Sequence, residues 1–457
     1  MKRRGTKLPN PSGPSAMDRR KFLRASTAAA APFILGCQGT PVAPAIEQAA
    51  PAILPPPIPP IPPDAIRVGL VGCGGRGTGA AANALLAADG NVYLTAVGDV
   101  FADRMDGSLA GLIESLAEKG DRVRVEPEKR FLGFDAYRQV VDSGVDVVIL
   151  ATPPHFRPAH LAYAIEQGKH VFCEKPIAVD APGVRSVMET VEKARARKLT
   201  LVSGLCWRYS LPHREIYQRI RDGAIGDVRA FYSTYNGVPN ATVPRKPGMS
   251  DMEMQIRNWY HFTWLGGDHI VEQAVHSLDK MAWCFQDAPP LSVVAIGGRS
   301  VPGPAERGNG YDHFGATFDY GNGVKGFHMA RQWSACPTEN HDYFYGAKGR
   351  AVIKGWDPLH EIDGENPWKY AGPGNDMYQC ELDEMMASIR AGEPRNDGVY
   401  MARSTLLGIM VRMAAYTGRV VTWEEALASQ ERLGPETYAL AEVPVAGLAV
   451  PGVTQFS

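Results

Sequence analysis

The stretch IRVGLVGCGGRGTGAAANALL, residues 66–86, decides the fold. It runs from a short apolar strand through a glycine-rich turn into a helix. The turn is a G-x-G-x-x-G, in which glycines allow a tight turn, close approach of the backbone to a pyrophosphate, and close packing of helix on strand. The phosphates of a dinucleotide are therefore expected at the N-terminus of the helix. The turn residues expected to hold the cofactor are Gly72, Gly74, Gly75, Arg76 and Gly77.

A second apolar stretch, VYLTAVGDV, carries Asp99, which lies 22 residues after Gly77. An acid at about this spacing hydrogen-bonds a ribose hydroxyl in dinucleotide-binding folds. Because a carboxylate repels a 2′-phosphate, Asp99 favours NAD(H) over NADP(H), while the nearby Arg104 keeps NADP possible. The alternative for Asp99 is a simple cap at the end of its strand.

Strands and helices continue to alternate after Asp99. The pattern predicts helices over about 102–119 and 136–142, with a short strand near 123–125 between them. The apolar run in VDVVILATPP predicts a strand buried in a parallel sheet, and a helix then ends at Gly168. Such an order is typical of a doubly wound α/β domain, which binds ligands at the carboxyl ends of its strands.

Two polar turns lie at those carboxyl ends. One follows the strand in VVILATPPH, and the other is the Glu-Lys-Pro that follows the strand in KHVFC. A lysine at the end of a buried strand points toward the cofactor cleft. These two turns add the following expected cofactor contacts: Thr152, Pro153, His155, Glu174 and Lys175.

The pattern changes after residue 186 to a mixture of helices and strands. A helix is expected in LPHREIYQRIRDG, and strands in VRAFYSTYNG, LSVVAIGGR, HFGATFDY and VKGFHMARQW. The last two flank Gly-Asn-Gly, which predicts a hairpin. We therefore expect a Rossmann domain over residues 64–185 and an α+β domain with a mainly antiparallel sheet over residues 186–457.

Three segments resemble the glucose–fructose oxidoreductase, inositol dehydrogenase and rhizopine-catabolism (Gfo/Idh/MocA) family. They are VGLVGCGGRG, VVILATPPHFRPAHLAYAIEQGKHVFCEKPIA and RIRDGAIGDV. The resemblance implies that Lys175 lies between nicotinamide and substrate and that Pro176 follows a cis peptide. It also implies a homo-oligomer that associates through the second sheet, and a closing helix, YMARSTLLGIMVRMAAYTG, that packs back on the first domain.

The family's chemistry falls in WLGGDHIVEQAVHSLD, where Glu272, His276 and Asp279 match its spacing. Positions i, i+4 and i+7 share one face of a helix, so the three side chains are expected to point into one cleft. His276 is the expected general base. Glu272 is expected to orient His276 or bind a hydroxyl, and it stands where the family often has Asp. A glutamate and a histidine four residues apart could form half a metal site, but no complete ligand set accompanies them, so no metal is expected.

The implied reaction is hydride transfer from a secondary alcohol of a sugar, glycoside or cyclitol to NAD(P), with His276 taking the proton and Lys175 stabilising the oxygen. One alternative is an NAD-dependent glycosidase that works by transient oxidation and elimination. Another is a non-catalytic, lipid-anchored binding protein. Trp259, Tyr260 and Trp264 could stack on a sugar or fill the core. The expected substrate contacts are Lys175, Arg208, Asp279, Tyr311 and His313.

The first 63 residues have a different character. Residues 1–39 contain Arg19–Arg20 followed by a short apolar run, which is typical of a twin-arginine export signal. The ILGC ending at Cys37 resembles a lipobox, with a bystander cysteine as the alternative. Residues 40–63 form a proline-rich linker. We therefore expect a periplasmic protein, anchored to a membrane through lipid on Cys37, whose cofactor is loaded before export and held tightly.

Composition excludes several other classes of protein. The chain has 457 residues, of which 45% are hydrophobic and 21% charged, and its formal net charge is −1. A nucleic-acid-binding protein usually shows a basic surplus, so no nucleic acid partner is expected. The seven cysteines include no C-x-x-C pair, which argues against a disulfide scaffold or a structural zinc site.

Overall fold

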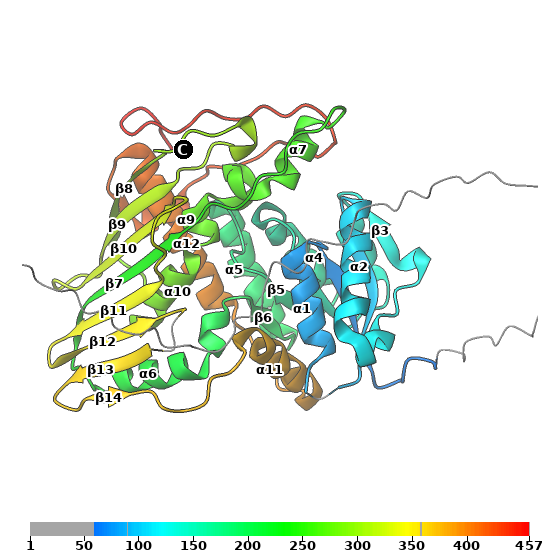
Figure 1. The fold of residues 1–457 in the computed structure, drawn as a ribbon, viewed down its shortest axis with the longest axis horizontal. Helices are drawn as coiled ribbons and strands as arrows, with labels where there is room; N and C mark the ends of the chain where they lie inside the picture. Colours follow the sequence, from blue (N-terminus) through cyan, green and yellow to red (C-terminus); the bar gives the residue numbers. More distant parts are fainter. Residues whose placement is uncertain (1–58, 89, 357–358, 457) are drawn as a thin grey trace, which may run out of the picture. The chain divides into compact units, whose positions relative to one another are not determined.

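The computed structural model describes residues 59–88, 90–356 and 359–456, and Figure 1 shows their helices and strands. The predicted export signal, Cys37 and most of the proline-rich linker lie outside the described residues. No helix within the described ranges is long and apolar enough to cross a membrane.

The first sheet has six parallel strands in the order β3-β2-β1-β4-β5-β6. This is the doubly wound order, in which strands are added first on one side of β1 and then on the other. The strand order therefore reverses between β1 and β4, and a crevice forms at their carboxyl ends. The sequence prediction of this domain is confirmed. Its elements are β1 (Ile66–Val71), α1 (Gly75–Leu85), β2 (Val92–Asp99), α2 (Ala102–Leu116), β3 (Arg130–Leu132), α3 (Ala136–Asp142), β4 (Val147–Leu150), α4 (Arg157–Glu166), β5 (His170–Cys173), α5 (Ala181–Ala196) and β6 (Leu201–Ser203).

Two details differ from the prediction. The strand expected near 123–125 is wrong, because Val123 makes only an isolated bridge to Leu94 and the third strand is β3. The chain passes through a 3-10 turn, η2 (Ala117–Arg122), before β3 pairs with β2. The expected domain boundary at residue 185 falls inside α5, and β6 still belongs to the first sheet, so that sheet ends later than expected.

The second sheet has nine strands in the order β14-β13-β12-β11-β7-β10-β9-β8-β15. Every pair is antiparallel except β7 with β10, so the expectation of a mainly antiparallel sheet is confirmed. The predicted hairpin joins β9 to β10 through Gly321 and Gly323, which have φ of 82° and 79°. The strands are β7 (Val228–Gly237), β8 (Ser292–Gly298), β9 (His313–Asp319), β10 (Lys325–Gln332), β11 (His341–Gly346), β12 (Gly349–Lys354), β13 (Leu359–Gly364), β14 (Trp368–Lys369) and β15 (Val421–Thr422).

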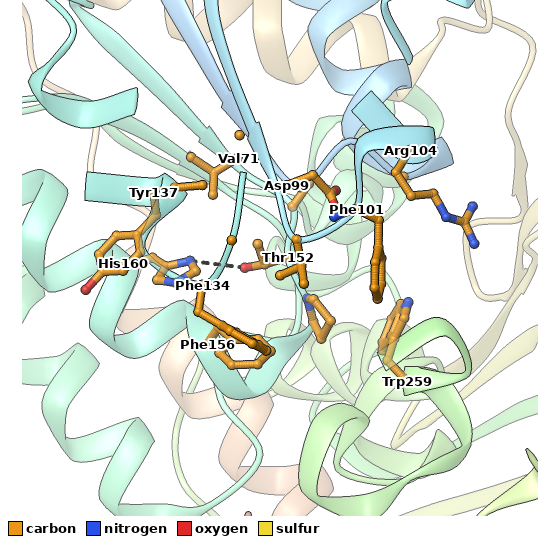
Figure 2. A pocket seen from close by; sticks show the side chains of 18 of the residues that line it. Val71, Asp99, Phe101, Arg104, Phe134, Tyr137, Thr152, Phe156, His160 and Trp259 are labelled. Atoms are coloured by element: carbon orange, nitrogen blue, oxygen red, sulfur yellow. Dashed lines mark hydrogen bonds between the residues drawn. The ribbon is translucent and has the colours of Figure 1, made fainter. Parts of the chain in front are cut away.

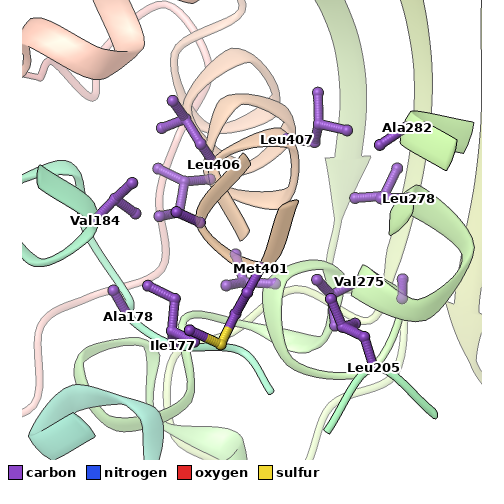
Figure 3. Close-up of a cluster of buried hydrophobic side chains, with 14 of the residues drawn as sticks. Ile177, Ala178, Val184, Leu205, Val275, Leu278, Ala282, Met401, Leu406 and Leu407 are labelled. Atoms are coloured by element: carbon purple, nitrogen blue, oxygen red, sulfur yellow. The ribbon is translucent and has the colours of Figure 1, made fainter. Parts of the chain in front are cut away.

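One helix, α12 (Gly398–Thr417), is buried along almost its whole length and joins the two domains. It packs against α5 and β6 of the first domain and against α10 (Val275–Cys284) and β8 of the second. Figure 3 shows its Met401, Leu406 and Leu407 between Ile177 and Val184 on one side and the side chains of α10 on the other. The expectation that this helix packs back on the first domain is confirmed.

Three short 3-10 turns are η3 (Pro127–Lys129), η4 (Pro154–Phe156) and η7 (Ala305–Arg307). The other helices surround the second sheet and its junction with the first domain. They are η5 (Cys206–Tyr209), α6 (Leu211–Arg221), α7 (Asp251–Arg257), η6 (Trp259–His261), α8 (Thr263–Gly266), α9 (His269–Glu272), α11 (Met377–Ala391) and α13 (Trp423–Ala428). After α13, residues 429–456 contain no helix or strand. This C-terminal strap, red in Figure 1, runs beside α7, and the amide of Met252 donates to the carbonyl of Ala441 at 3.0 Å.

Candidate active site

A pocket of about 190 Å³ opens at the carboxyl ends of β1, β2 and β4, as Figure 2 shows from close by. This is the crevice that the doubly wound order creates. Six of the expected cofactor contacts line it, namely Gly72, Gly74, Gly75, Asp99, Thr152 and Pro153. The structure therefore brings together the glycine turn, the acid after β2 and the turn after β4.

The glycines fit a pyrophosphate. Gly72 has φ of 94°, and a Cβ there would lie 2.6 Å from the backbone carbon of Ala151. A Cβ at Gly77 would clash with the carbonyl oxygen of Gly72, so this glycine allows α1 to pack closely on the turn. At Gly74 and Gly75 a Cβ would meet no atom within 4 Å. Because these two positions face open space at the N-terminus of α1, phosphate oxygens can approach the backbone there.

The carboxylate of Asp99 caps the glycine turn and also borders the pocket. One of its oxygens accepts from the amide of Cys73 at 2.7 Å, and the other accepts from the amide of Phe101 at 2.9 Å. Burial raises the pKa of Asp99 above its usual value. Each carboxylate oxygen keeps a further lone pair, so the capping role and a ribose contact are compatible. Arg104 lines the same pocket.

An aromatic wall surrounds this pocket, and Trp259 is the one member of it that the sequence analysis singled out, as a residue that could stack on a sugar or fill the core. The rings come from separate segments of the chain, so no local pattern in the sequence could have revealed the wall as a whole. His160 stacks on Tyr137 with ring centroids 4.0 Å apart, and its Nδ1 lies 3.3 Å from the hydroxyl of Thr152. Burial lowers the pKa of His160 to about 3, so this ring is neutral. The other aromatic residues of the wall are Phe101, Phe134, Phe156 and Trp259.

The expected catalytic lysine meets the second domain directly. The Lys175–Pro176 peptide is cis, as the resemblance implied. The Nζ of Lys175 donates to Oε1 of Glu272 at 3.0 Å and to its backbone carbonyl at 2.7 Å. Both side chains are largely buried. The carboxyl end of β5 and the end of α9 are therefore joined by a charged contact.

His276 lies close to this pair, but not on the single helix that the sequence predicted. The helix breaks at residues 273–274, so Glu272 ends α9 and His276 begins the first turn of α10. His276 is 9% exposed, and among the described residues its Nδ1 has no hydrogen-bond partner. Burial, with Lys175 next in importance, lowers the pKa of His276 well below its usual value. The imidazole is therefore neutral and able to accept a proton.

Asp279, the third residue of the expected constellation, turns away from Lys175. It pairs with Arg208, whose Nη2 lies 2.8 Å from its Oδ1, and it accepts from the hydroxyl of Ser404 at 2.8 Å. Arg208 also pairs with Asp287 at 2.5 Å. Asp279, on α10, therefore faces Arg208 of η5. The structure therefore pairs two expected substrate contacts, Arg208 and Asp279, with each other in a buried ionic cluster.

The other two expected substrate contacts also have partners of their own. The amide of Tyr311 donates to Asp268 at 2.7 Å and its hydroxyl donates to the carbonyl of Ala449 at 2.8 Å. The Nδ1 of His313 lies 2.8 Å from a carboxylate oxygen of Asp312. Neither residue is hydrogen-bonded to Lys175 in the part of the chain that the structure describes.

Several expected cofactor contacts lie beside the pocket and not in its wall. Nε of Arg76 lies 2.7 Å from Oε1 of the buried Glu174. The Nε2 of His155 is hydrogen-bonded to the hydroxyl of Tyr438 at 2.8 Å, and burial lowers the pKa of His155 to about 4. Like Gly77, Lys175 and His276, these three residues do not line the pocket.

A buried arginine that the sequence analysis did not single out braces both polar turns. Arg157 is 4% exposed. Its Nε donates to the carbonyl of Thr152 at 2.8 Å and its Nη1 to the carbonyl of Pro176 at 2.5 Å. The turns after β4 and β5 are thus fixed to each other.

Among the described residues, no group of three or more His, Cys, Asp or Glu could hold a metal ion.

The fold and this pocket define a class of protein: a dinucleotide-binding protein in which a second, sheet-based domain brings an acid and an imidazole to the cofactor domain. Two family models match the chain. Residues 66–203 match the oxidoreductase family with an NAD-binding Rossmann fold, and residues 213–352 match the C-terminal domain of the same family. Together the matches span more than half of the chain, which belongs to the Gfo/Idh/MocA family.

The matches to individual proteins are at low sequence identity. Inositol 2-dehydrogenase 4 of Saccharopolyspora erythraea is 31% identical over 214 residues, which cover 46% of this chain and 56% of that protein. The chain thus spans little more than half the length of this relative. The 1,5-anhydro-D-fructose reductase of Ensifer adhaerens is 26% identical over 332 residues, covering 70% of this chain and 92% of that protein. The structure of aldose-aldose oxidoreductase from Caulobacter crescentus is similar in fold, with a TM-score of 0.60, 18% identity, and coverage of 78% and 99% of the two chains.

Proposed function

We propose that the protein is an NAD(P)-dependent oxidoreductase that acts on a secondary alcohol of a sugar, glycoside or cyclitol. The contact of Lys175 with Glu272, beside the neutral His276, is the observation that carries this proposal. A neutral imidazole that can accept the proton, and an ammonium group that can donate a hydrogen bond to the same oxygen, are what removal of a hydroxyl proton requires. NAD is the expected cofactor, since Asp99 borders the pocket, and Arg104 keeps NADP open.

The residues of the glycine turn, with Asp99 and Thr152, would hold the dinucleotide in the pocket. When bound, the cofactor supplies an acceptor for the hydride that leaves the alcohol carbon. The chain's own residues handle the proton and the oxygen. His276 accepts the hydroxyl proton, and Lys175 donates a hydrogen bond to the same oxygen as negative charge develops on it. Glu272 occupies two of the three donors of the ammonium group and so aims the third.

The relatives support this substrate class. The names of the matched proteins include an inositol dehydrogenase and an anhydrofructose reductase, which point to cyclitols and sugars. Because the match to the inositol dehydrogenase covers 56% of that protein, the substrate of this chain remains part of the proposal.

We also propose that the chain is exported by the twin-arginine route and anchored in the periplasm by lipid on Cys37. The paired Arg19–Arg20 and the apolar run before Cys37 support this. A homo-oligomer through the outer face of the second sheet is proposed as well. That face carries exposed apolar side chains, among them Val294, Ile296 and Met329, and Ile296 is 74% exposed.

The proposal is tested by recording the absorbance of the purified protein before and after adding a panel of sugars, cyclitols and glycosides. We expect the band of reduced nicotinamide to appear with one substrate and to fade with a second carbonyl compound. His276→Gln should slow its appearance by about 10²–10⁴-fold. His341→Gln, at the start of β11, is the matched control and should leave the rate unchanged.

The other outcomes separate the alternatives. Cleavage of a glycoside without a lasting change in the band would instead support a glycosidase that oxidises its substrate transiently. Bound nucleotide that no carbohydrate reduces would support a non-catalytic binding protein. Failure to bind either NAD or NADP would overturn the assignment of the cofactor.

A further inference from the structure

One member of the aromatic wall comes from the second domain. Trp259 lies on η6, between β7 and α9, yet it lines the pocket together with Phe101 of the cofactor domain. Figure 2 shows Trp259 on a ribbon of the second domain, below Phe101. The cofactor domain alone therefore lacks part of the pocket's wall.

The segment that carries Trp259 is fastened to the cofactor domain by an ion pair. The Nη1 and Nη2 of Arg257, at the end of α7, reach the two carboxylate oxygens of Asp103 on α2 at 3.0 and 3.1 Å. The guanidinium carbon of Arg257 also lies 4.0 Å from the ring centroid of Phe101. A bidentate pair that also covers an aromatic ring is more specific in geometry than a single contact. Because Phe101 lines the pocket, this pair lies at its rim.

The C-terminal strap supports the segment from its other side. The side chain of Gln255, which is fully buried, donates to the carbonyl of Val443 at 2.8 Å and accepts from the indole of Trp264 at 2.7 Å. Tyr438 of the strap has its ring centroid 5.7 Å from Phe134 and 5.3 Å from Phe156, both of which line the pocket.

An apolar cluster joins all three parts. It unites one residue from the cofactor domain, several from the segment around Trp259, and one from the strap. Burying this surface together means that the segment cannot lift away without exposing apolar side chains to water. The buried residues of the cluster are Phe101, Met249, Met252, Met254, Ile256, Phe262, Trp264, Leu265 and Val443.

We propose that residues 249–266 and the C-terminal strap form a clasp that closes over the adenosine end of the bound dinucleotide. Trp259 supplies an aromatic face for the adenine, and the Arg257–Asp103 pair is the latch that limits how fast the nucleotide leaves. The inference rests on the proposed function, since it takes the pocket to hold NAD(P). It deepens that function because a clasped nucleotide remains bound while one substrate is oxidised and a second is reduced.

The test is the rate at which the nucleotide leaves the full-length protein. Protein loaded with labelled NAD is chased with excess unlabelled NAD, and the retained label is followed with time. Trp259→Ala and Arg257→Ala should each release NAD at least about tenfold faster than the unchanged protein, which corresponds to about 1.4 kcal/mol. Asp103→Ala should also speed release, and adding it to Arg257→Ala should have little further effect, because the two substitutions remove the same ion pair.

Arg195→Ala is the matched control. It removes an ion pair with Glu192 on the exposed surface of α5, away from the pocket, and should leave the release rate unchanged. If Arg257→Ala fails to fold, Asp103→Ala still tests the ion pair. The side chain of Asp103 is 64% exposed, so its replacement should leave the protein folded.

Release rates equal to that of the unchanged protein in the Trp259 and Asp103 variants would overturn the clasp and leave the oxidoreductase intact. Absence of any nucleotide binding by the unchanged protein would overturn both.

Discussion

The glycines of the G-x-G-x-x-G turn are required for different physical reasons. Gly77 is required by the protein itself, because a side chain there would collide with the carbonyl of Gly72. Gly74 would meet no protein atom within 4 Å if it carried a Cβ, so the reason for a glycine there is the approach of a ligand. A substitution at one of these positions therefore tests the stability of the turn, and a substitution at the other tests the binding of the nucleotide.

We expect Gly74→Ala to fold normally and to bind NAD at least about tenfold more weakly, since the methyl group would occupy the space that the pyrophosphate approaches. Gly77→Ala should lower the melting temperature, because α1 must move away from the turn. Thermal unfolding without nucleotide and titration with NAD measure the two effects separately. Equal affinity in Gly74→Ala would show that the pyrophosphate does not lie on this turn.

At the level of elements, the break between α9 and α10 decides which side chains share the active site. A continuous helix would have set Glu272, His276 and Asp279 on one face. The break leaves Glu272 on Lys175 and sends Asp279 to Arg208. Asp279 is 1% exposed, so its negative charge depends on the arginine that faces it.

We expect Arg208→Met to reduce the free energy of unfolding by about 3–5 kcal/mol, the usual loss when one partner of a buried ion pair is removed. Adding Asp279→Leu should restore much of that loss, because the fully buried carboxylate is then gone, whereas Asp287, whose side chain is 24% exposed, keeps contact with water. Arg350→Met, which removes the exposed pair with Asp363 on the second sheet, is the control and should change stability little. Denaturant unfolding measures all four proteins. A normal stability with a raised KM in Arg208→Met would favour the substrate contact that the sequence suggested.

The sequence predicted the elements whose signal is local. The glycine turn, Asp99 and the Glu-Lys-Pro turn stand within a few residues of the strands that position them, so their places in the sheet followed from the order of the elements. The helix break and the Arg208–Asp279 pair could not be predicted in this way, because each depends on a partner far away in the sequence. The same holds for Trp259 and the C-terminal strap, which have no periodic pattern and gain their position only from the assembled domains.

On the scale of the whole molecule, buried histidines in both domains make the stability of the fold depend on pH. Several histidines are buried as neutral rings, and burial is the main cause of their low pKa values. The pKa is about 3 for His160 in the first domain and about 3 for His328 in the second. It is lowered well below its usual value for His213 and His276. Glu381 acts in the opposite sense, because burial raises its pKa.

The unfolded chain binds protons at these histidines below pH of about 6.5, whereas the folded chain does not until its own lower pKa values are reached. Stability is therefore retained above pH 6.5 and falls as the pH decreases from there toward 3, by up to about 1.4 kcal/mol per pH unit for each such histidine. We expect the melting temperature to drop steadily between pH 6.5 and 5, and His328→Gln to make that drop shallower by the share of one histidine. His341→Gln, on strand β11 of the same sheet and with a partly exposed side chain, is the matched control for the loss of a histidine that is not fully buried. A melting temperature that does not change across this range would mean that protons taken up at these rings on unfolding are balanced by protons released from buried carboxyls such as Glu381.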